Sequence, residues 1–108
     1  MSYTNKITWN PLQSIDSSTF TGSYLLLGTL LNPATICKIV NNSNVLVTIS
    51  VDGLQDHDIL PANSFVLYDE DASGTPDPQV LPNGTKFFVK GSVGSGLVYL
   101  ISQYIIQT

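Results

Sequence analysis

The sequence contains no arginine, and charged residues of either sign make up only 11% of its 108 residues. Four lysines stand against eight acidic residues, which gives a net charge of −4, and the lysines form no run. Proteins that bind nucleic acid normally present a basic face with arginines that contact phosphates and guanines. The composition therefore argues against nucleic acid as a direct partner.

The scarcity of charge also bears on the surface of the folded protein. A free monomer commonly has about 25% charged residues, most of them exposed to water. This chain must therefore cover its surface with uncharged polar groups, or leave apolar groups there for a partner to cover. Its hydrophobic content of 43% argues against disorder, and its length leaves room for one domain.

Only one cysteine is present, Cys37, which excludes an internal disulfide and a CxxC metal framework. It lies in the apolar stretch 36–40, where we expect a buried, unreactive thiol. No apolar run approaches the ~20 residues of a membrane span, and the N-terminus lacks the apolar core of a signal peptide. We expect a soluble, unprocessed chain without a membrane partner.

From Phe20 onward, hydrophobic residues recur with a period of two, and turn residues separate the strand-like segments. Seven strands are expected at 24–31, 35–40, 45–51, 56–60, 65–68, 85–92 and 96–106. Connections this short favour antiparallel pairing, because parallel strands need long crossovers. The sequence predicts an all-β fold, a single antiparallel β-sandwich (Ig-like or jelly-roll-like) over residues 19–108, with a small barrel as the second choice.

The clearest alternation lies at 45–51, and it predicts which side chains face the core. Val45, Val47, Ile49 and Val51 should be buried, whereas Thr48 and Ser50 should be exposed. Two glycine-containing segments are predicted to be hairpins, Asp52-Gly53 and Val93-Gly94-Ser95.

Residues 1–18 are polar and lack periodicity, and we interpret them as an N-terminal arm. Trp9 is the one large apolar side chain of this arm, and it should pack on the domain or on a neighbour.

Two predicted strands, at 24–31 and 96–106, have apolar residues on both faces. A two-layer sandwich buries only one face of each strand. Either the arm or a loop folds over the second face, or that face is a subunit interface. The interface candidates are Trp9, Tyr24, Leu25, Leu27, Val98, Leu100, Tyr104 and Ile106.

The acidic segment 69–74 has oxygen-bearing residues at alternate positions, Asp69, Asp71 and Ser73, followed by Gly74. This spacing matches the first half of a calcium-binding loop. The carboxylate that should close such a loop is replaced by Val80. We therefore expect a solvated connection that holds no metal ion.

A second polar cluster, Asp56-His57-Asp58, contains the single histidine of the chain. On a strand, the two aspartates would share one face and His57 the other, so this spacing disfavours a metal site. No catalytic set with His57 or Cys37 is evident, and we expect neither enzymatic activity nor a cofactor.

Several segments together resemble small accessory structural proteins of tailed bacteriophages. They are residues 38–42, 47–53, 56–57, 60–62, 84–91 and 94–99, and the likeness spans roughly residues 20–106. The resemblance implies a virion component: a capsid decoration (cement) protein, or a part of the head–tail or tail apparatus. Its partners would be other phage structural proteins, copies of itself, or both. The resemblance supplies no catalytic residues.

Two other functions remain open at this point. A carbohydrate- or receptor-binding β-sandwich module would need exposed aromatic side chains in a groove, and Trp9 and Tyr68 are the residues to inspect. An enzyme would need carboxylates gathered around His57.

Overall fold

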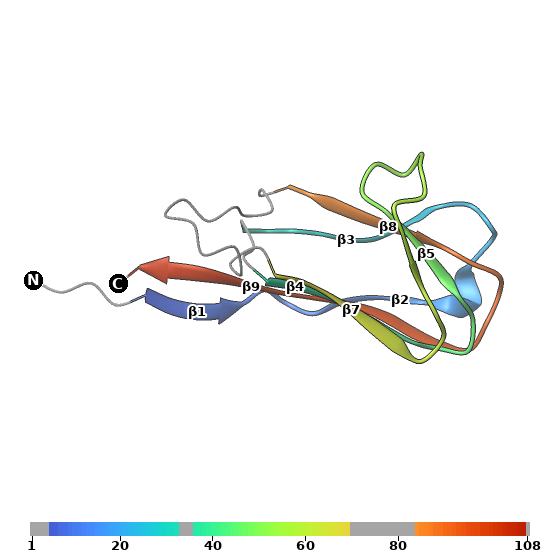
Figure 1. Ribbon diagram of the computed structural model, residues 1–108, viewed down its shortest axis with the longest axis horizontal. Helices are drawn as coiled ribbons and strands as arrows, with labels where there is room; N and C mark the ends of the chain where they lie inside the picture. Colours follow the sequence, from blue (N-terminus) through green and yellow to red (C-terminus); the bar gives the residue numbers. More distant parts are fainter. Residues whose placement is uncertain (1–4, 33–35, 70–83, 108) are drawn as a thin grey trace, which may run out of the picture.

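The computed structural model describes residues 5–32, 36–69 and 84–107, which contain nine strands in two antiparallel sheets (Figure 1). Sheet A has the order β1 (Asn5–Trp9), β9 (Gly96–Gln107), β4 (Ile36–Ser43) and β7 (Ser64–Asp69), and β2 (Gln13–Asp16) also pairs with β9. Sheet B has the order β3 (Leu25–Thr29), β8 (Lys86–Lys90), β5 (Val47–Ser50) and β6 (Asp58–Leu60). The sheets pack face to face as two layers, which confirms the predicted all-β sandwich.

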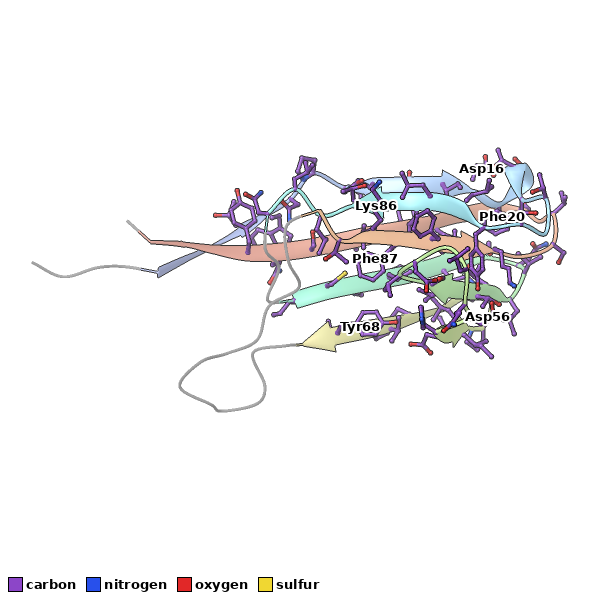
Figure 2. The ribbon with its side chains drawn as sticks, turned by 90° about the horizontal axis from the view of Figure 1, so that it is seen from above. Asp16, Phe20, Asp56, Tyr68, Lys86 and Phe87 are labelled. Atoms are coloured by element: carbon purple, nitrogen blue, oxygen red, sulfur yellow. The ribbon has the colours of Figure 1, made fainter. Side chains whose placement is uncertain are left out.

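The core lies between the sheets and takes alternate residues from each strand. Its buried hydrophobic side chains are Phe20, Leu27, Leu30, Cys37, Ile39, Val47, Ile49, Leu60, Phe87, Val89, Val98 and Leu100. Phe20 and Phe87 are the aromatic members of this core and are labelled in Figure 2. The predicted burial of Cys37 is confirmed, and burial raises the pKa of its thiol to about 12, so the thiol is protonated at neutral pH.

Strand β5 buries Val47 and Ile49 as predicted, but the alternation stops at its end. Val51 is exposed and Ser50 is buried, so both were assigned to the wrong side. The strand ends at Ser50, whose hydroxyl donates to Asp52 Oδ1 at 2.8 Å and accepts the Gly53 N–H at 2.9 Å. Residues 51–57 form the loop that joins β5 to its antiparallel neighbour β6, so the predicted hairpin at Asp52-Gly53 is confirmed, with a loop longer than a tight turn and a positive φ of 75° at Gly53.

The predicted hairpin at Val93-Gly94-Ser95 is wrong, because this segment joins β8 of sheet B to β9 of sheet A. The segment 91–95 runs beside residues 44–46, which cross between the same two sheets, and the Asn44 N–H donates to the Ser95 carbonyl at 3.1 Å. A Cβ on Gly94 would lie 2.7 Å from Asn44 Oδ1. The glycine permits this close approach of two crossovers.

The described part of residues 1–18 is not a free arm. Strand β1 pairs with β9 from Asn5↔Gln107 to Trp9↔Gln103, and β2 pairs with residues 97–100 of the same strand. The interpretation of this segment as an arm is therefore wrong for residues 5–16, which belong to sheet A. Removing residues 1–18 would take away two strands of the sheet.

The break between β1 and β2 falls at residues 10–12, where Pro11 has no N–H for the ladder. Asn10 closes this gap from a buried position: its N–H donates to the Ser102 carbonyl at 3.0 Å, and its Nδ2 donates to Ser102 Oγ at 2.8 Å. Asn32 donates to Asn10 Oδ1 at 2.8 Å. These bonds satisfy a buried amide that would otherwise be costly to bury.

Candidate functional site

The side of sheet A that faces away from sheet B is mainly apolar. Val40 lies opposite Phe65 on one neighbouring strand and opposite Tyr99 on the other, and Lys38 likewise lies opposite Leu67 and Ile101. Residues directly opposite one another in a sheet project to the same side. We call this surface the outer face of sheet A and define it by Trp9, Lys38, Val40, Phe65, Leu67, Tyr99 and Ile101.

Large side chains on this face are open to water. Trp9 and Phe65 are each 61% exposed, and Leu67 is 50% exposed. Val40, Tyr99 and Ile101 are half-buried. Single exposed hydrophobic residues are ordinary, but Phe65 and Leu67 on β7 continue into the half-buried apolar residues of β4 and β9, and a contiguous apolar patch of this kind is a candidate interaction surface.

Lys38 is the positively charged residue within these rows, and Asp69 lies at the end of the row that contains Trp9, opposite Ile36. Its Nζ lies 4.8 Å from the centre of the Phe65 ring, in a cation–π arrangement. The ammonium group stays in water while the aliphatic part of the side chain covers the sheet. The face is therefore an aromatic and aliphatic surface with a lysine near its middle and Asp69 at its margin.

The structure places some of the predicted interface residues in the core and others at the surface. Leu27, Val98 and Leu100 are at most 4% exposed and belong to the core, so their assignment to an interface is wrong. Strand β9 is apolar on both sides, and its inward side is the one that contains Val98 and Leu100. The outward side of the same strand contributes Tyr99 and Ile101 to the outer face of sheet A.

The other interface candidates have mixed positions. Trp9 lies on the outer face of sheet A, because it is opposite Gln103, which is opposite Ile36 on β4. Leu25 packs partly buried against the core, and Tyr104 is half-buried. The side chain of Ile106 lies outside the part of the chain that the structure describes.

Tyr24 belongs to a polar cluster on sheet B. Its hydroxyl donates to Asp56, and Lys90 forms an ion pair with the same carboxylate at 3.0 Å while its Nζ lies 4.6 Å from the Tyr24 ring centre. The hydrogen bonds from Tyr24 and Lys90 lower the pKa of Asp56, and Asp56 raises the pKa of Lys90. Both charges of the cluster are thus already paired within the chain.

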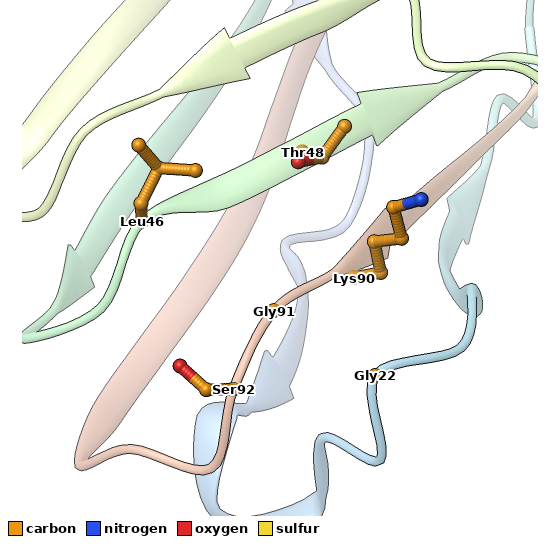
Figure 3. Close-up of a pocket in the computed structure, with 6 residues that line it drawn as sticks. All are labelled: Gly22, Leu46, Thr48, Lys90, Gly91 and Ser92. Carbon is orange, nitrogen blue, oxygen red and sulfur yellow. The ribbon is translucent and has the colours of Figure 1, made fainter.

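An open pocket of about 380 Å³ lies beside this cluster (Figure 3). It is lined by Gly22, Leu46, Thr48, Lys90, Gly91 and Ser92. Lys90 is the ionisable side chain in this lining, and it is paired with Asp56. The pocket offers hydroxyl and backbone groups but no acid–base pair among its lining residues.

The Asp56-His57-Asp58 segment divides its side chains among different partners. Asp58 Oδ2 accepts the Tyr68 hydroxyl at 2.8 Å, and His57 Nδ1 accepts the Val51 N–H at 3.1 Å. Within the described residues, no three His, Cys, Asp or Glu side chains gather as a metal site. The acidic segment 70–74, with its calcium-like spacing, lies outside the described residues.

Sequence reasoning missed Phe65 and Leu67, although a usable signal was present. Residues 65–68 form a predicted strand with apolar residues on both faces. The predicted strands 24–31 and 96–106 supplied interface candidates because they have the same property. Applying the same criterion to this strand identifies Phe65 and Leu67. Gln13 and Asn10 were also missed, because their partners are distant in the sequence and only the fold brings them together.

A scan against protein-family models found no match, and neither did searches of curated proteins and of solved structures. Among the described residues, no helix is long and apolar enough to cross a membrane.

Proposed function

We propose that this protein is a non-enzymatic structural subunit of a tailed-bacteriophage virion, of the capsid decoration (cement) or head–tail accessory type. The outer face of sheet A is the observation that carries the proposal. Phe65, Leu67 and Trp9 present their side chains to water from strands of a hydrogen-bonded sheet. The resemblance of residues 20–106 to accessory phage proteins supports the particular kind of assembly.

The energetics favour a partner for this face. Covering a few hundred Å² of apolar surface contributes several kcal/mol at about 25 cal/mol per Å² before the cost of association is subtracted. A sheet held by β-ladders loses little conformational freedom on binding, which keeps that cost low. The partners would be other structural proteins of the particle or copies of this chain.

The proposal is tested by purifying particles of the virus that encodes this chain and measuring its copy number by quantitative mass spectrometry. We expect many copies per particle for the wild type and a loss of incorporation for Leu67→Lys. The matched control is Leu26→Lys on the outer side of sheet B, because Leu26 is 49% exposed and receives the same substitution. Absence of the wild-type chain from particles, or equal incorporation of both variants, would refute the proposal.

A carbohydrate-binding module is the second candidate, and the exposure of Trp9 favours it. Tyr68 is not available for this role, because its hydroxyl bonds Asp58 and its ring stacks on Phe87 with 6.4 Å between centroids. A glycan array would distinguish the two functions. Binding that is lost in Trp9→Ala but kept in Leu67→Lys would favour the module.

A further inference from the structure

The free edges of the two sheets differ in how they are protected. An exposed edge strand invites pairing with another chain unless it is short, bulged, charged or covered. Strand β6 has three residues, beginning with Asp58. Strand β3 has a bulge between Leu26 and Gly28. In addition, Gln13 Nε2 donates to the Thr29 carbonyl at 2.8 Å, and the Thr29 N–H donates to Gln13 Oε1 at 3.0 Å. Both edges of sheet B are therefore protected.

One edge of sheet A is interrupted. Strands β1 and β2 share this edge of β9, but they are separated at residues 10–12, where Pro11 has no N–H. Each of them has five residues or fewer. This edge presents no long continuous strand to a partner.

Within the part of the chain that the structure describes, strand β7 is protected only at its end, by the charge of Asp69. It pairs with β4 over six consecutive residues without a bulge, and no other described strand pairs with it. Residues 64–68 contain no charge, proline or glycine, and Phe65 and Leu67 are exposed on the same side. Figure 2 shows the strand, marked by Tyr68, at the margin of the sheet.

We infer that β7 pairs antiparallel with β7 of a second copy of this chain, about a two-fold axis at Val66. In this register Phe65 lies opposite Leu67 of the partner subunit, and the arrangement repeats on the other side of the axis. An isologous contact of this kind closes as a dimer. Centring the axis on Leu67 instead would place Phe65 opposite Asp69 of the partner subunit, an unfavourable pairing of an aromatic ring with a carboxylate.

A second copy suits this edge for two reasons. The register around Val66 is self-complementary, since each exposed apolar residue meets an exposed apolar residue and no like charges meet. The pairing also joins the outer faces of two A sheets into one continuous surface, with Lys38 beside Leu67 on each side. This inference deepens the proposed function, on which its biological role rests, by naming the partner for one edge of the same sheet.

Sedimentation velocity of the full-length chain from ~10 µM to ~1 mM tests the inference, because pairing of one strand per subunit gives a small interface and weak association. We expect a concentration-dependent dimer. Phe65→Lys and Leu67→Glu should each weaken it by about tenfold or more, whereas the control Leu26→Lys should leave it unchanged. Circular dichroism of each variant checks that the fold is kept.

Mixing Phe65→Lys with Leu67→Glu tests the register itself. In the mixed dimer the new lysine faces the new glutamate, and the second pair keeps its original apolar residues, so dimers should form more readily than in either variant alone. A wild type that stays monomeric at ~1 mM, an unaffected Phe65→Lys dimer, or a mixture without recovery would each overturn the inference. If Leu67→Lys also loses incorporation into particles while the wild type is monomeric, the proposed function stands and only the dimer fails.

Discussion

The outer faces of the two sheets differ in how far other residues of the chain cover them. On sheet B, the loop 51–57 packs over part of the face: a Cβ placed on Gly53 would lie 3.5 Å from the Phe88 ring, and Ser50 is fully buried. On sheet A, Phe65 and Leu67 are exposed to water. The chain covers part of one outer face with its own residues and leaves large apolar side chains of the other exposed to water.

Local hydrogen bonds hold the covering loop in place. Asp52 Oδ1 accepts the N–H groups of Leu54 and Gln55 at 2.8 and 3.0 Å, and the His57 N–H donates to the Ile49 carbonyl at 2.9 Å. Charge-assisted bonds from backbone N–H groups to a carboxylate are stronger than neutral ones. His57, the middle residue of the Asp56-His57-Asp58 cluster, also helps to close this loop, because its Nδ1 accepts the Val51 N–H at 3.1 Å.

The largest effect is expected from Ile49→Ala, because both sheets depend on the core between them. Ile49 is 1% exposed and packs in the main hydrophobic cluster. We expect a loss of ~2–5 kcal/mol in the free energy of unfolding, measured by urea denaturation, through the cavity that the substitution leaves. Thr48→Ala on the opposite side of the same strand should change stability by less than ~0.5 kcal/mol. Equal losses at the two positions would contradict the observed register.

Ser50→Ala should specifically weaken the packing of the loop 51–57 over sheet B. The substitution removes the acceptor for the Asp52 and Gly53 N–H groups and the donor to Asp52 Oδ1. Leaving such groups without a partner costs about 1–3 kcal/mol. Hydrogen exchange should show faster opening at residues 52–55 while β4 and β9 of sheet A stay protected. Uniform loss of protection across both sheets would contradict this local role.

The smallest effect concerns pH. Backbone N–H groups of Gln55 and Leu54 lower the pKa of Asp52 from 3.8 to about 2. Because the pKa is lower in the folded state, the stabilisation is complete above pH ~4 and is lost as the pH falls towards 2. The urea midpoint should therefore fall over this range, and it should fall less in Asp52→Asn.

A control for this measurement comes from Asp16. Its pKa is also lowered, by the Ser18 backbone N–H, and its share of the pH dependence should persist in Asp52→Asn. Identical pH profiles for the wild type and Asp52→Asn would show that Asp52 contributes no acid sensitivity.

Much of the fold follows from local chemistry in the sequence. Period-two alternation and short turns predict antiparallel strands, and they place Val47 and Ile49 correctly in the core. The apolar neighbours of Cys37 are enough to predict its burial. Strands β1 and β2 were missed because their few apolar residues make a weak pattern, and their pairing with β9 depends on residues about 90 positions away, as the 92-residue separation of the Asn10–Ser102 hydrogen bond shows.

The sequence by itself determined the class of fold and the presence of more apolar strand faces than one core can bury. Only the tertiary structure decided which faces those are. Alternation tells which side chains share a side of a strand, but on β9 both sides are apolar, so Val98 and Tyr99 look equally suited to the core. Packing against sheet B buried Val98, and the position of β7 at the edge of sheet A left Phe65 and Leu67 in water. Burial depends on which surfaces meet across the sandwich, and local sequence does not encode that meeting.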